Sequence, residues 1–169
     1  NSTTQDITVT IIDVEENGNT PVITSSSTFT ADENQTAIGT VTATDADGDD
    51  ITFTVSGSEL AITSAGVLTF TLAPDYETKA TYTATVTASD GTNSTTQDIT
   101  VNVTNVNDGS PVFTSSTTFS AAENQTAIGT VTATDADGDS VTFTVSGSEL
   151  AITSAGVLTF ASAPDYETK

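Results

Sequence analysis

Residues 44–50 read TDADGDD and place four carboxylates in one short stretch, which returns as TDADGDS at 134–140. Two carboxylates about 4 Å apart repel by roughly 4 kcal/mol at an effective dielectric constant of about 20. The 169-residue chain has 23 acidic and only 2 basic side chains, for a net charge of -21. Because lysine and arginine cannot neutralise these acids, the acids are either dispersed over solvated surface or bound by cations.

The composition excludes several kinds of chemistry. The chain has no cysteine and no histidine, so disulfides, thiolate or imidazole metal sites and a Ser-His-Asp triad are all ruled out. Its acidity argues against binding nucleic acid or an anionic membrane surface. No apolar run is long enough to span a membrane. The N-terminus does not read as a signal peptide, so we expect any export signal to lie outside this segment.

The acids recur at fixed places in a repeated text. They lie in ADEN and AAEN, in PDYE (74–77 and 164–167), in SDGT (89–92) and in the linker NVNDGSP (105–111). Clustered oxygen ligands without nitrogen or sulfur partners favour a hard cation, and calcium accepts six to eight oxygens in flexible geometry. The stretch DADGDD is not an EF-hand loop, because its glycine comes fourth and Ser56 stands where that loop has its closing glutamate. A cation site must therefore be assembled from distant segments.

An internal repeat of about 90 residues organises the chain. Residues 22–79 align without gaps on 112–169 and are identical at 50 of 58 positions, and residues 1–8 return at 93–100. We predict that 1–17 is the last strand and linker of a preceding repeat and that 18–108 is a complete repeat. Residues 109–169 are then an incomplete next repeat that lacks its last two strands. We expect the chain to be a segment of a longer array.

The alternation of apolar and polar residues predicts strands throughout. TVTATD (40–45), ITFTVSG (51–57), TYTATVTASD (81–90) and DITVNVTNV (98–106) alternate strictly. LAITSAGVLTF (60–70) reads as two short strands around a turn at Gly66, and PVFTSSTTFSA (111–121) as the strand that opens a repeat. Seven strands in about 90 residues predict an all-β fold of tandem seven-stranded Greek-key β-sandwiches of the immunoglobulin-like type, with the second copy truncated.

These motifs, in this order, resemble the cadherin repeat in its bacterial cadherin-like form. The matching pieces are Glu33 in DEN, TATDADGD, PDYE for the family's Asp-x-Glu, ASDG, and NVNDGSPVF for its linker. The resemblance spans the whole chain, and its strength lies in five weak motifs that follow one another at the family's spacing. It implies calcium ions at the junctions between consecutive repeats, in an extracellular or cell-surface protein.

The resemblance implies a ligand set for each junction. For the central one, the set is Glu33, Asp75 and Glu77 from the full copy, Asn105, Asn107 and Asp108 from the linker, and Asp135 and Asp137 from the next copy. For the first junction it includes Asp45, Asp47, Asp90, Asp13, Glu15, Asn17 and Asn19. Glu123, Asp165 and Glu167 form half of a third site. Asn105 and Gly109 replace an aspartate and an asparagine of the family's linker, which removes one charge and puts one of the usual three ions in doubt.

Other interpretations of the same residues are weaker. The acids could be plain solvated loop residues, and Asp49 and Asp50 read as turn residues rather than ligands. A glycosidase pair in DYE finds no support from an aromatic-lined cleft, so we predict that the protein is not an enzyme. The Thr-x-Thr alternation could form a flat ice- or sugar-binding face, but it is usually the wet side of a sheet.

The sequence therefore predicts a calcium-rigidified extracellular spacer of a repetitive bacterial surface adhesin or filament. The alternative is an adhesion module whose sandwich itself binds a glycan or a sister repeat. A further hypothesis concerns self-assembly: residues 1–9 match the strand that the last copy lacks, so a neighbouring molecule's N-terminus could dock there by strand addition.

Overall fold

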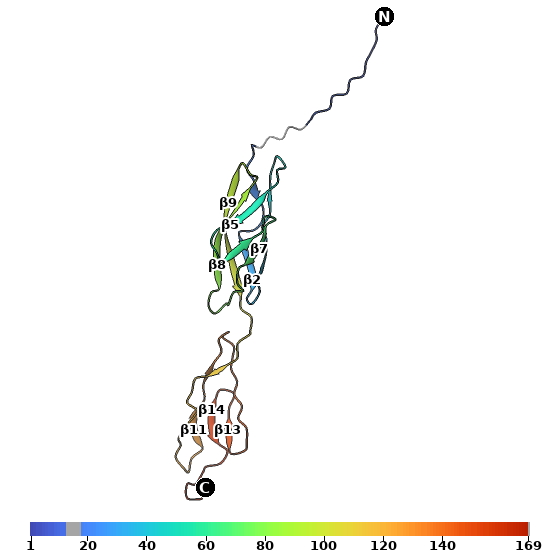
Figure 1. The fold of residues 1–169 in the computed structure, drawn as a ribbon. Helices are drawn as coiled ribbons and strands as arrows, with labels where there is room; N and C mark the ends of the chain where they lie inside the picture. Colours follow the sequence, from blue (N-terminus) through green and yellow to red (C-terminus); the bar gives the residue numbers. More distant parts are fainter. Residues whose placement is uncertain (13–17, 169) are drawn as a thin grey trace. The chain divides into compact units, whose positions relative to one another are not determined.

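A computed structural model of the protein describes residues 1–12 and 18–168. The chain divides into two compact units, unit 1 (Asn1–Thr104) and unit 2 (Asn105–Lys169). Every regular element in the described part is a β-strand (Figure 1). The all-β prediction is therefore confirmed.

Unit 1 is a β-sandwich, and its larger sheet has the strand order β2-β9-β8-β5. The strands are β2 (Thr28–Asp32), β9 (Ser94–Thr104), β8 (Thr81–Ser89) and β5 (Thr52–Val55). β8 and β9 form a long antiparallel hairpin, and β2 lies parallel to β9 with Phe29 opposite Val101. The alternation of apolar and threonine residues turns one face of this sheet inward and the other toward solvent.

The second sheet of unit 1 has the order β3-β7-β6, with β3 (Ala37–Thr40), β7 (Val67–Phe70) and β6 (Leu60–Ile62). β1 (Val22–Ile23) and β4 (Ala43–Thr44) pair with each other and form a separate two-stranded sheet. The predicted turn between β6 and β7 is present at Gly66, which adopts a φ of +84°. A Cβ there would lie 2.2 Å from the carbonyl oxygen of Val41, so only glycine fits.

The core of unit 1 lies between the two sheets. Leu68, Val86 and Val101 are fully buried, and they pack in one cluster with Val41, Phe53, Leu60, Phe70, Ala88 and Ile99. Because β8 and β9 contribute much of this cluster, the sandwich closes only when both strands are in place. The core thus depends on residues far apart in the sequence.

Two of the seven predicted strands are divided in the structure. The opening strand splits into β1 and β2, because β1 pairs with β4 whereas β2 pairs with β9. The strand predicted at 40–45 is likewise shared between β3 and β4, and Val41 between them donates its amide to the carbonyl of Gly66. Each division marks the point where the chain changes its pairing partner, which alternation alone does not reveal.

Unit 2 repeats the second sheet of unit 1, as β11 (Ala127–Thr130), β14 (Val157–Phe160) and β13 (Leu150–Ile152). It also repeats the short pair, as β10 (Val112–Phe113) with β12 (Ala133–Thr134). The strand expected over 111–121 is therefore present only at β10, and no strand forms at 141–147. These segments match β2 and β5, whose partners in unit 1 are β9 and β8, and unit 2 contains no counterpart of either.

Residues 1–12 form no strand and are exposed throughout. Residues 1–9 are identical to residues 93–101 of unit 1, most of which lie in β9, the strand that is held by hydrogen bonds to both β2 and β8. The boundaries proposed for a preceding repeat, at 1–17, stay a prediction, and part of that range lies outside the described residues. The described part of the chain contains no helix long and apolar enough to cross a membrane.

Candidate metal centres

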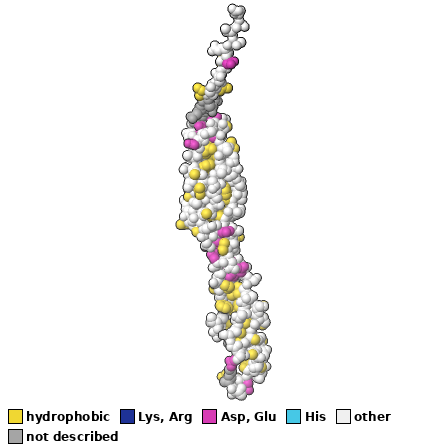
Figure 2. Space-filling view, turned by 90° about the vertical axis from the view of Figure 1, so that its right-hand side faces the viewer, with side chains coloured by type: hydrophobic (Ala, Val, Ile, Leu, Met, Phe, Trp, Pro, Cys, Tyr) yellow, Lys and Arg dark blue, Asp and Glu magenta, His cyan; other side chains and the backbone are white. Residues whose placement is uncertain are grey.

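Acidic side chains gather at the two ends of each unit, whereas hydrophobic and uncharged groups cover the middle on the face shown in Figure 2. In unit 1 these ends correspond to the turn of the β8–β9 hairpin and to its opposite, open end. Asp90 follows β8 at the turn end, and Glu33 donates its amide to the carbonyl of Thr104 at the other. β9 has 11 residues, so these ends are separated by about 34 Å. Each unit thus carries two separate acidic clusters.

The turn-end cluster of unit 1 contains Asp45, Asp47 and Asp49. All three are half-buried, and each offers one carboxylate oxygen within 4.8 Å of the others. They lie in the turn that follows β4, in which Gly48 adopts a φ of +83°. The amide of Asp47 donates to Oδ1 of Asp45 over 2.8 Å, which orients the first carboxylate.

Asn19, which lies in the segment that precedes β1, donates hydrogen bonds to this cluster. Its backbone amide donates to Oδ2 of Asp47 over 2.8 Å and its Nδ2 donates to Oδ1 over 2.5 Å. The amide of Gly18 also donates to Oδ2. These donors, with the Asn19 backbone amide first, lower the pKa of Asp47 below its ordinary value of 3.8 and keep the carboxylate ionised.

Asp90 joins the same end of the unit through Asn93. The backbone amides of Asn93 and Thr92 donate to Oδ1 of Asp90, and these bonds, that of Asn93 first, lower the pKa of Asp90. The Nδ2 of Asn93 in turn donates to the backbone carbonyl of Asn19 over 2.9 Å. One hydrogen-bonded path therefore connects Asp47, Asn19, Asn93 and Asp90.

Unit 2 builds the corresponding cluster from its linker. The Nδ2 of Asn105 donates to the carbonyl of Asp137, and the amide of Gly109 donates to Oδ2 of Asp137 over 2.8 Å. Asn107 donates to Asp139. Asp137 also donates its own amide to Oδ1 of Asp135 over 3.1 Å, as Asp47 does to Asp45. The linker of unit 2 thus takes the place that Asn19 has in unit 1.

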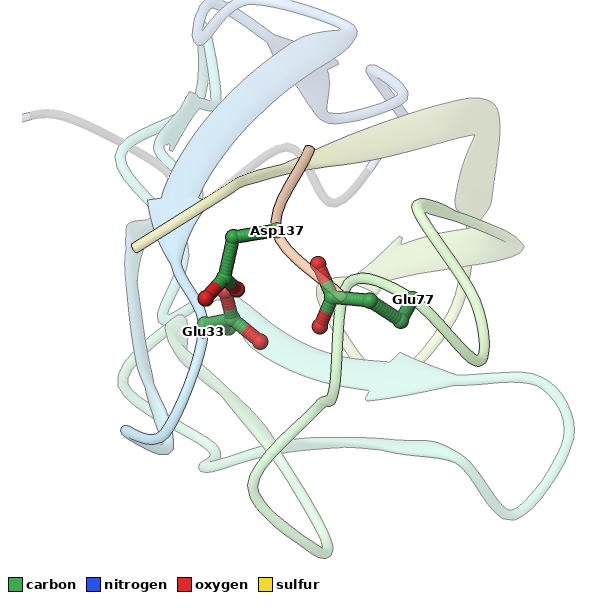
Figure 3. Close-up of side chains that lie close together, drawn as sticks. All are labelled: Glu33, Glu77 and Asp137. Atoms are coloured by element: carbon green, nitrogen blue, oxygen red, sulfur yellow. The ribbon is translucent and has the colours of Figure 1, made fainter. Parts of the chain in front are cut away.

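The other end of unit 1 presents Glu33 and Glu77, whose carboxylates lie within 4.8 Å of one another (Figure 3). Glu33 is buried, and its Oε2 accepts a hydrogen bond from the amide of Tyr76 over 2.8 Å. Asp137, also labelled in Figure 3, belongs to unit 2. Asp75 is engaged locally, because both of its carboxylate oxygens accept hydrogen bonds from Thr78.

Unit 2 has the same arrangement at its matching end. Glu123, Asp165 and Glu167 are exposed, and each offers one carboxylate oxygen within 4.8 Å of the others. The amide of Tyr166 donates to Oε2 of Glu123 over 2.9 Å, as Tyr76 does to Glu33. The repeat therefore preserves the hydrogen bond from the tyrosine amide to the glutamate, although Glu33 is buried and Glu123 is exposed.

Some carboxylate oxygens at these clusters are buried without a donor. Oδ2 of Asp45, Oδ2 of Asp90 and Oδ1 of Asp137 are closed to solvent and accept no hydrogen bond from any described residue. Burying an ionised carboxylate oxygen without a partner is costly. A cation bound beside such an oxygen would remove this cost.

Within each unit, the structure brings together many of the residues predicted as ligands. Asp45, Asp47, Asp90 and Asn19 share one end of unit 1, and Asn105, Asn107, Asp135 and Asp137 share one end of unit 2. Asp108 is exposed in the same linker. Asp13 and Asn17 lie outside the described residues, as does Glu15. Whether any of these residues binds an ion stays a prediction.

Sequence reasoning missed Asp49 and Asp139, as well as Asn93. Asp49 was interpreted as a turn residue, but it lies half-buried with Asp45 and Asp47. Its signal was available, because Asp45, Asp47 and Asp49 follow the same two-residue spacing used for PDYE. Asn93 carried no such signal, since its role depends on the Asn19 carbonyl, 74 residues away in the sequence.

Comparison with known proteins finds relatives that are named as cadherins. The chain is 35% identical over 152 residues to the cadherin EGF LAG seven-pass G-type receptor 1 of Mus musculus, and equally so to that of Homo sapiens. These matches cover 80% of this chain but only 5% of each receptor.

Solved structures show the same fold. Human protocadherin-24 EC1-2 superposes with a TM-score of 0.77 at 23% identity, covering 88% of this chain and 80% of that one. Mouse cadherin-23 EC22-24 superposes with a TM-score of 0.71 at 27% identity, covering 89% and 57%. Fold and acidic motifs together define a cadherin-like β-sandwich repeat.

Within that class, residues 17–104 match the family described as Bacterial Ig domain. Because this match covers more than half of the chain, the chain belongs to the bacterial Ig domain family. Cadherin-like and Ig-like domains are typically structural or adhesion domains rather than enzymes.

Proposed function

We propose that this chain is a calcium-rigidified spacer from an extracellular or cell-surface protein, with ions held at the junctions between consecutive repeats. The observation that carries the proposal is the set of buried carboxylate oxygens without donors, on Asp45, Asp90 and Asp137. They belong to clusters that offer only oxygen ligands, and the chain has only 2 basic residues against 23 acids. A hard divalent cation fits such a donor set.

The residues proposed to hold the ions follow the clusters of each unit. Glu33, Glu77 and Asp75 serve from unit 1, and Asp135, Asp137, Asn105, Asn107 and Asp108 from unit 2, for one junction. Asp45, Asp47, Asp49, Asp90 and Asn19 serve a preceding junction, and Glu123, Asp165 and Glu167 a following one. Bound calcium supplies positive charge that offsets the mutual repulsion of the carboxylates.

The chain's own residues prepare these clusters for an ion. The two amides of Asn19 fix both oxygens of Asp47, and the amide of Gly109 fixes one oxygen of Asp137, so those carboxylates lose little freedom when they bind. Because each unit carries one cluster at each end, consecutive units can be coupled repeatedly along an array. Supporting this role, the relatives are named as cadherins. The bacterial adhesin or filament in which the spacer serves is part of the proposal.

A calcium titration of chelated protein, followed by the melting temperature, tests this function. We expect a calcium-specific rise at the roughly 10⁻⁴ to 10⁻³ M typical of extracellular modules, with magnesium far weaker at equal concentration. An ion present at a hundred times its Kd adds about 2.7 kcal/mol to the free energy of unfolding. No rise, or an equal rise with magnesium, would refute the proposal. Binding on a glycan array would instead favour the alternative adhesion module.

A further inference from the structure

Lys79 is the only basic side chain in the described part of the chain, since the second basic residue, Lys169, lies outside it. Its Nζ lies 2.5 Å from Oε1 and 2.7 Å from Oε2 of Glu59, and both oxygens accept a hydrogen bond from it. The same Nζ lies 4.4 Å from the centre of the Tyr82 ring, which is within the range of a cation–π contact. These contacts hold the ammonium, although the side chains of Lys79 and Glu59 are 41% and 52% exposed.

Both partners of Lys79 are fixed by the β-sandwich of unit 1. The backbone carbonyl of Glu59, which directly precedes β6, accepts hydrogen bonds from the amide and from Oγ1 of Thr71. Tyr82 belongs to β8, and its ring packs edge-on against Phe70 with the ring centroids 5.0 Å apart. Glu59 and Tyr82 therefore set one place for the ammonium on the surface of unit 1.

The turn that leads to Lys79 also carries Asp75 and Glu77, two of the acids proposed as metal ligands. The backbone amide of Lys79 donates to the carbonyl of Asp75 over 2.9 Å, so residues 75–79 make a single helix-like turn. Side chains four residues apart in such a turn are neighbours, and an acid four residues before a lysine is a favourable pair. The local spacing therefore predicts an ion pair between Lys79 and Asp75. The structure instead pairs Lys79 with Glu59, 20 residues away in the sequence.

A lysine ammonium among these carboxylates would compete with a divalent cation. The ammonium and the cation are attracted by the same negative charge, and a carboxylate oxygen that accepts a hydrogen bond from lysine is engaged when an ion arrives. Calcium takes six to eight oxygen ligands, so a carboxylate held by lysine weakens its site. The position of Lys79 therefore bears on the cation affinity of the Glu33–Glu77 cluster, the pair of glutamates at this end of unit 1 together with Asp75.

We propose that Glu59 is a positioning residue of the Glu33–Glu77 cluster, because it holds the Lys79 ammonium away from the carboxylates of Asp75 and Glu77 and leaves them to the cation. The inference rests on the function proposed above, and it adds a residue that belongs to none of the acidic clusters. The one basic side chain of the described part is thus bound by an acid that is not a proposed ligand. The acids proposed as ligands keep their full negative charge.

Proton NMR of the protein in a chelator tests the position of Lys79 independently of calcium. An aromatic ring shifts protons above its face upfield, so the ε-methylene protons of Lys79 should resonate upfield of those of lysine in an unstructured peptide. Glu59→Ala removes both oxygens that hold the ammonium, and we expect most of this upfield shift to be lost. An unshifted signal in the wild-type chain, or an equal shift in the variant, would show that Glu59 does not position Lys79 and would overturn the inference.

A calcium titration at low ionic strength, followed by the amide resonance of Tyr76, reports the affinity at this cluster, because that amide donates to Glu33. Glu59→Ala should bind calcium about two- to fivefold more weakly than the matched control Asp98→Ala, which loses the same charge on β9; this is the range of a surface ion pair. The double variant Glu59→Ala/Lys79→Gln should regain the affinity of Lys79→Gln, because no ammonium is left to compete.

The outcomes of this titration separate the inference from the function on which it rests. A purely structural ion pair would make both single variants lose affinity alike, without recovery in the double variant. That pattern, or equal affinities of Glu59→Ala and Asp98→Ala, would overturn the positioning role of Glu59. A wild-type chain that binds no calcium would instead refute the proposed function itself.

Discussion

Asn19 donates its backbone amide and its side-chain amide to the two carboxylate oxygens of Asp47, over 2.8 and 2.5 Å. Asn19 precedes β1, the first strand of unit 1, whereas Asp47 follows β4. The two hydrogen bonds therefore connect the segment that leads into unit 1 with the acidic cluster. They also lower the pKa of Asp47 and fix the direction of its carboxylate. Asn19 is therefore a residue that orients a proposed ligand.

Asn19→Ala should weaken calcium binding without unfolding unit 1. Loss of a group that orients a metal ligand typically lowers metal affinity by about 10- to 100-fold. The melting temperature in a chelator should change little, since the bond lies at an exposed site. Isothermal titration calorimetry measures the affinity, with Asn102→Ala, exposed on β9, as the matched control. Equal affinities of the two variants would show that Asn19 has no such role.

Asp137→Asn should have opposite effects with and without calcium. Oδ1 of Asp137 is buried without a donor among the described residues, so removing its charge relieves strain in the ion-free cluster. In a chelator the melting temperature should stay equal or rise. With calcium, a tenfold loss of affinity at a concentration of a hundred wild-type Kd lowers the stabilisation by that ion from about 2.7 to about 1.4 kcal/mol.

The control for this prediction is Asp98→Asn, which makes the same charge change on β9 away from the clusters. Asp98 accepts a hydrogen bond from Oγ1 of Thr85, and an asparagine oxygen can accept it too. Differential scanning calorimetry should show an almost unchanged calcium response for this variant. A loss of calcium response in both variants would point to a general effect of net charge instead.

The sequence predicted the sandwich well because its strands obey a local rule. Val86 and Val101 alternate with threonines, and both are fully buried in the structure. Local patterns do not state pairing partners, however. The identical text TFTV therefore forms β5 in unit 1 but no strand at 142–145, where no counterpart of β8 is present to accept its hydrogen bonds.

The clusters were predictable only in part, for a related reason. Repetition and spacing identify Glu33 and Asp137, because these carry a charge at a fixed motif position. Asn93 and Gly109 act through an amide that reaches a partner distant in the sequence, and no local pattern marks them. The engagement of Asp75 by Thr78 was equally hidden, since it depends on the turn that follows PDYE.

Gly66→Ala should destabilise unit 1 far more than Gly57→Ala. The two glycines have nearly equal φ angles of +84° and +81°, so both substitutions cost about 1–3 kcal/mol of backbone strain. A Cβ at Gly57 meets nothing within 4 Å, whereas one at Gly66 lies 2.2 Å from the carbonyl oxygen of Val41. Urea unfolding followed by circular dichroism should therefore show the larger loss for Gly66→Ala, and equal losses would show that the turn yields without cost.

Phe70→Ala should destabilise its unit more than Phe160→Ala does. The two phenylalanines occupy matching positions of the repeat but differ in how deeply they are buried. Phe70 is 2% exposed and packs edge-on against Tyr82 of β8, with ring centroids 5.0 Å apart. Phe160 is half-buried and lines an apolar pocket of unit 2, with a volume of about 450 Å³. Truncating a fully buried phenylalanine costs about 3–5 kcal/mol, because both the transfer of the ring and the cavity left behind count. Phe160→Ala should cost less in its own unit, since Phe160 is only half-buried and its loss widens an existing pocket. The protection of backbone amides from hydrogen exchange, followed separately in β7 and β14, measures the loss of stability in each unit. A loss of protection as large in β14 as in β7 would mean that Phe160 is packed as tightly in unit 2 as Phe70 is in unit 1.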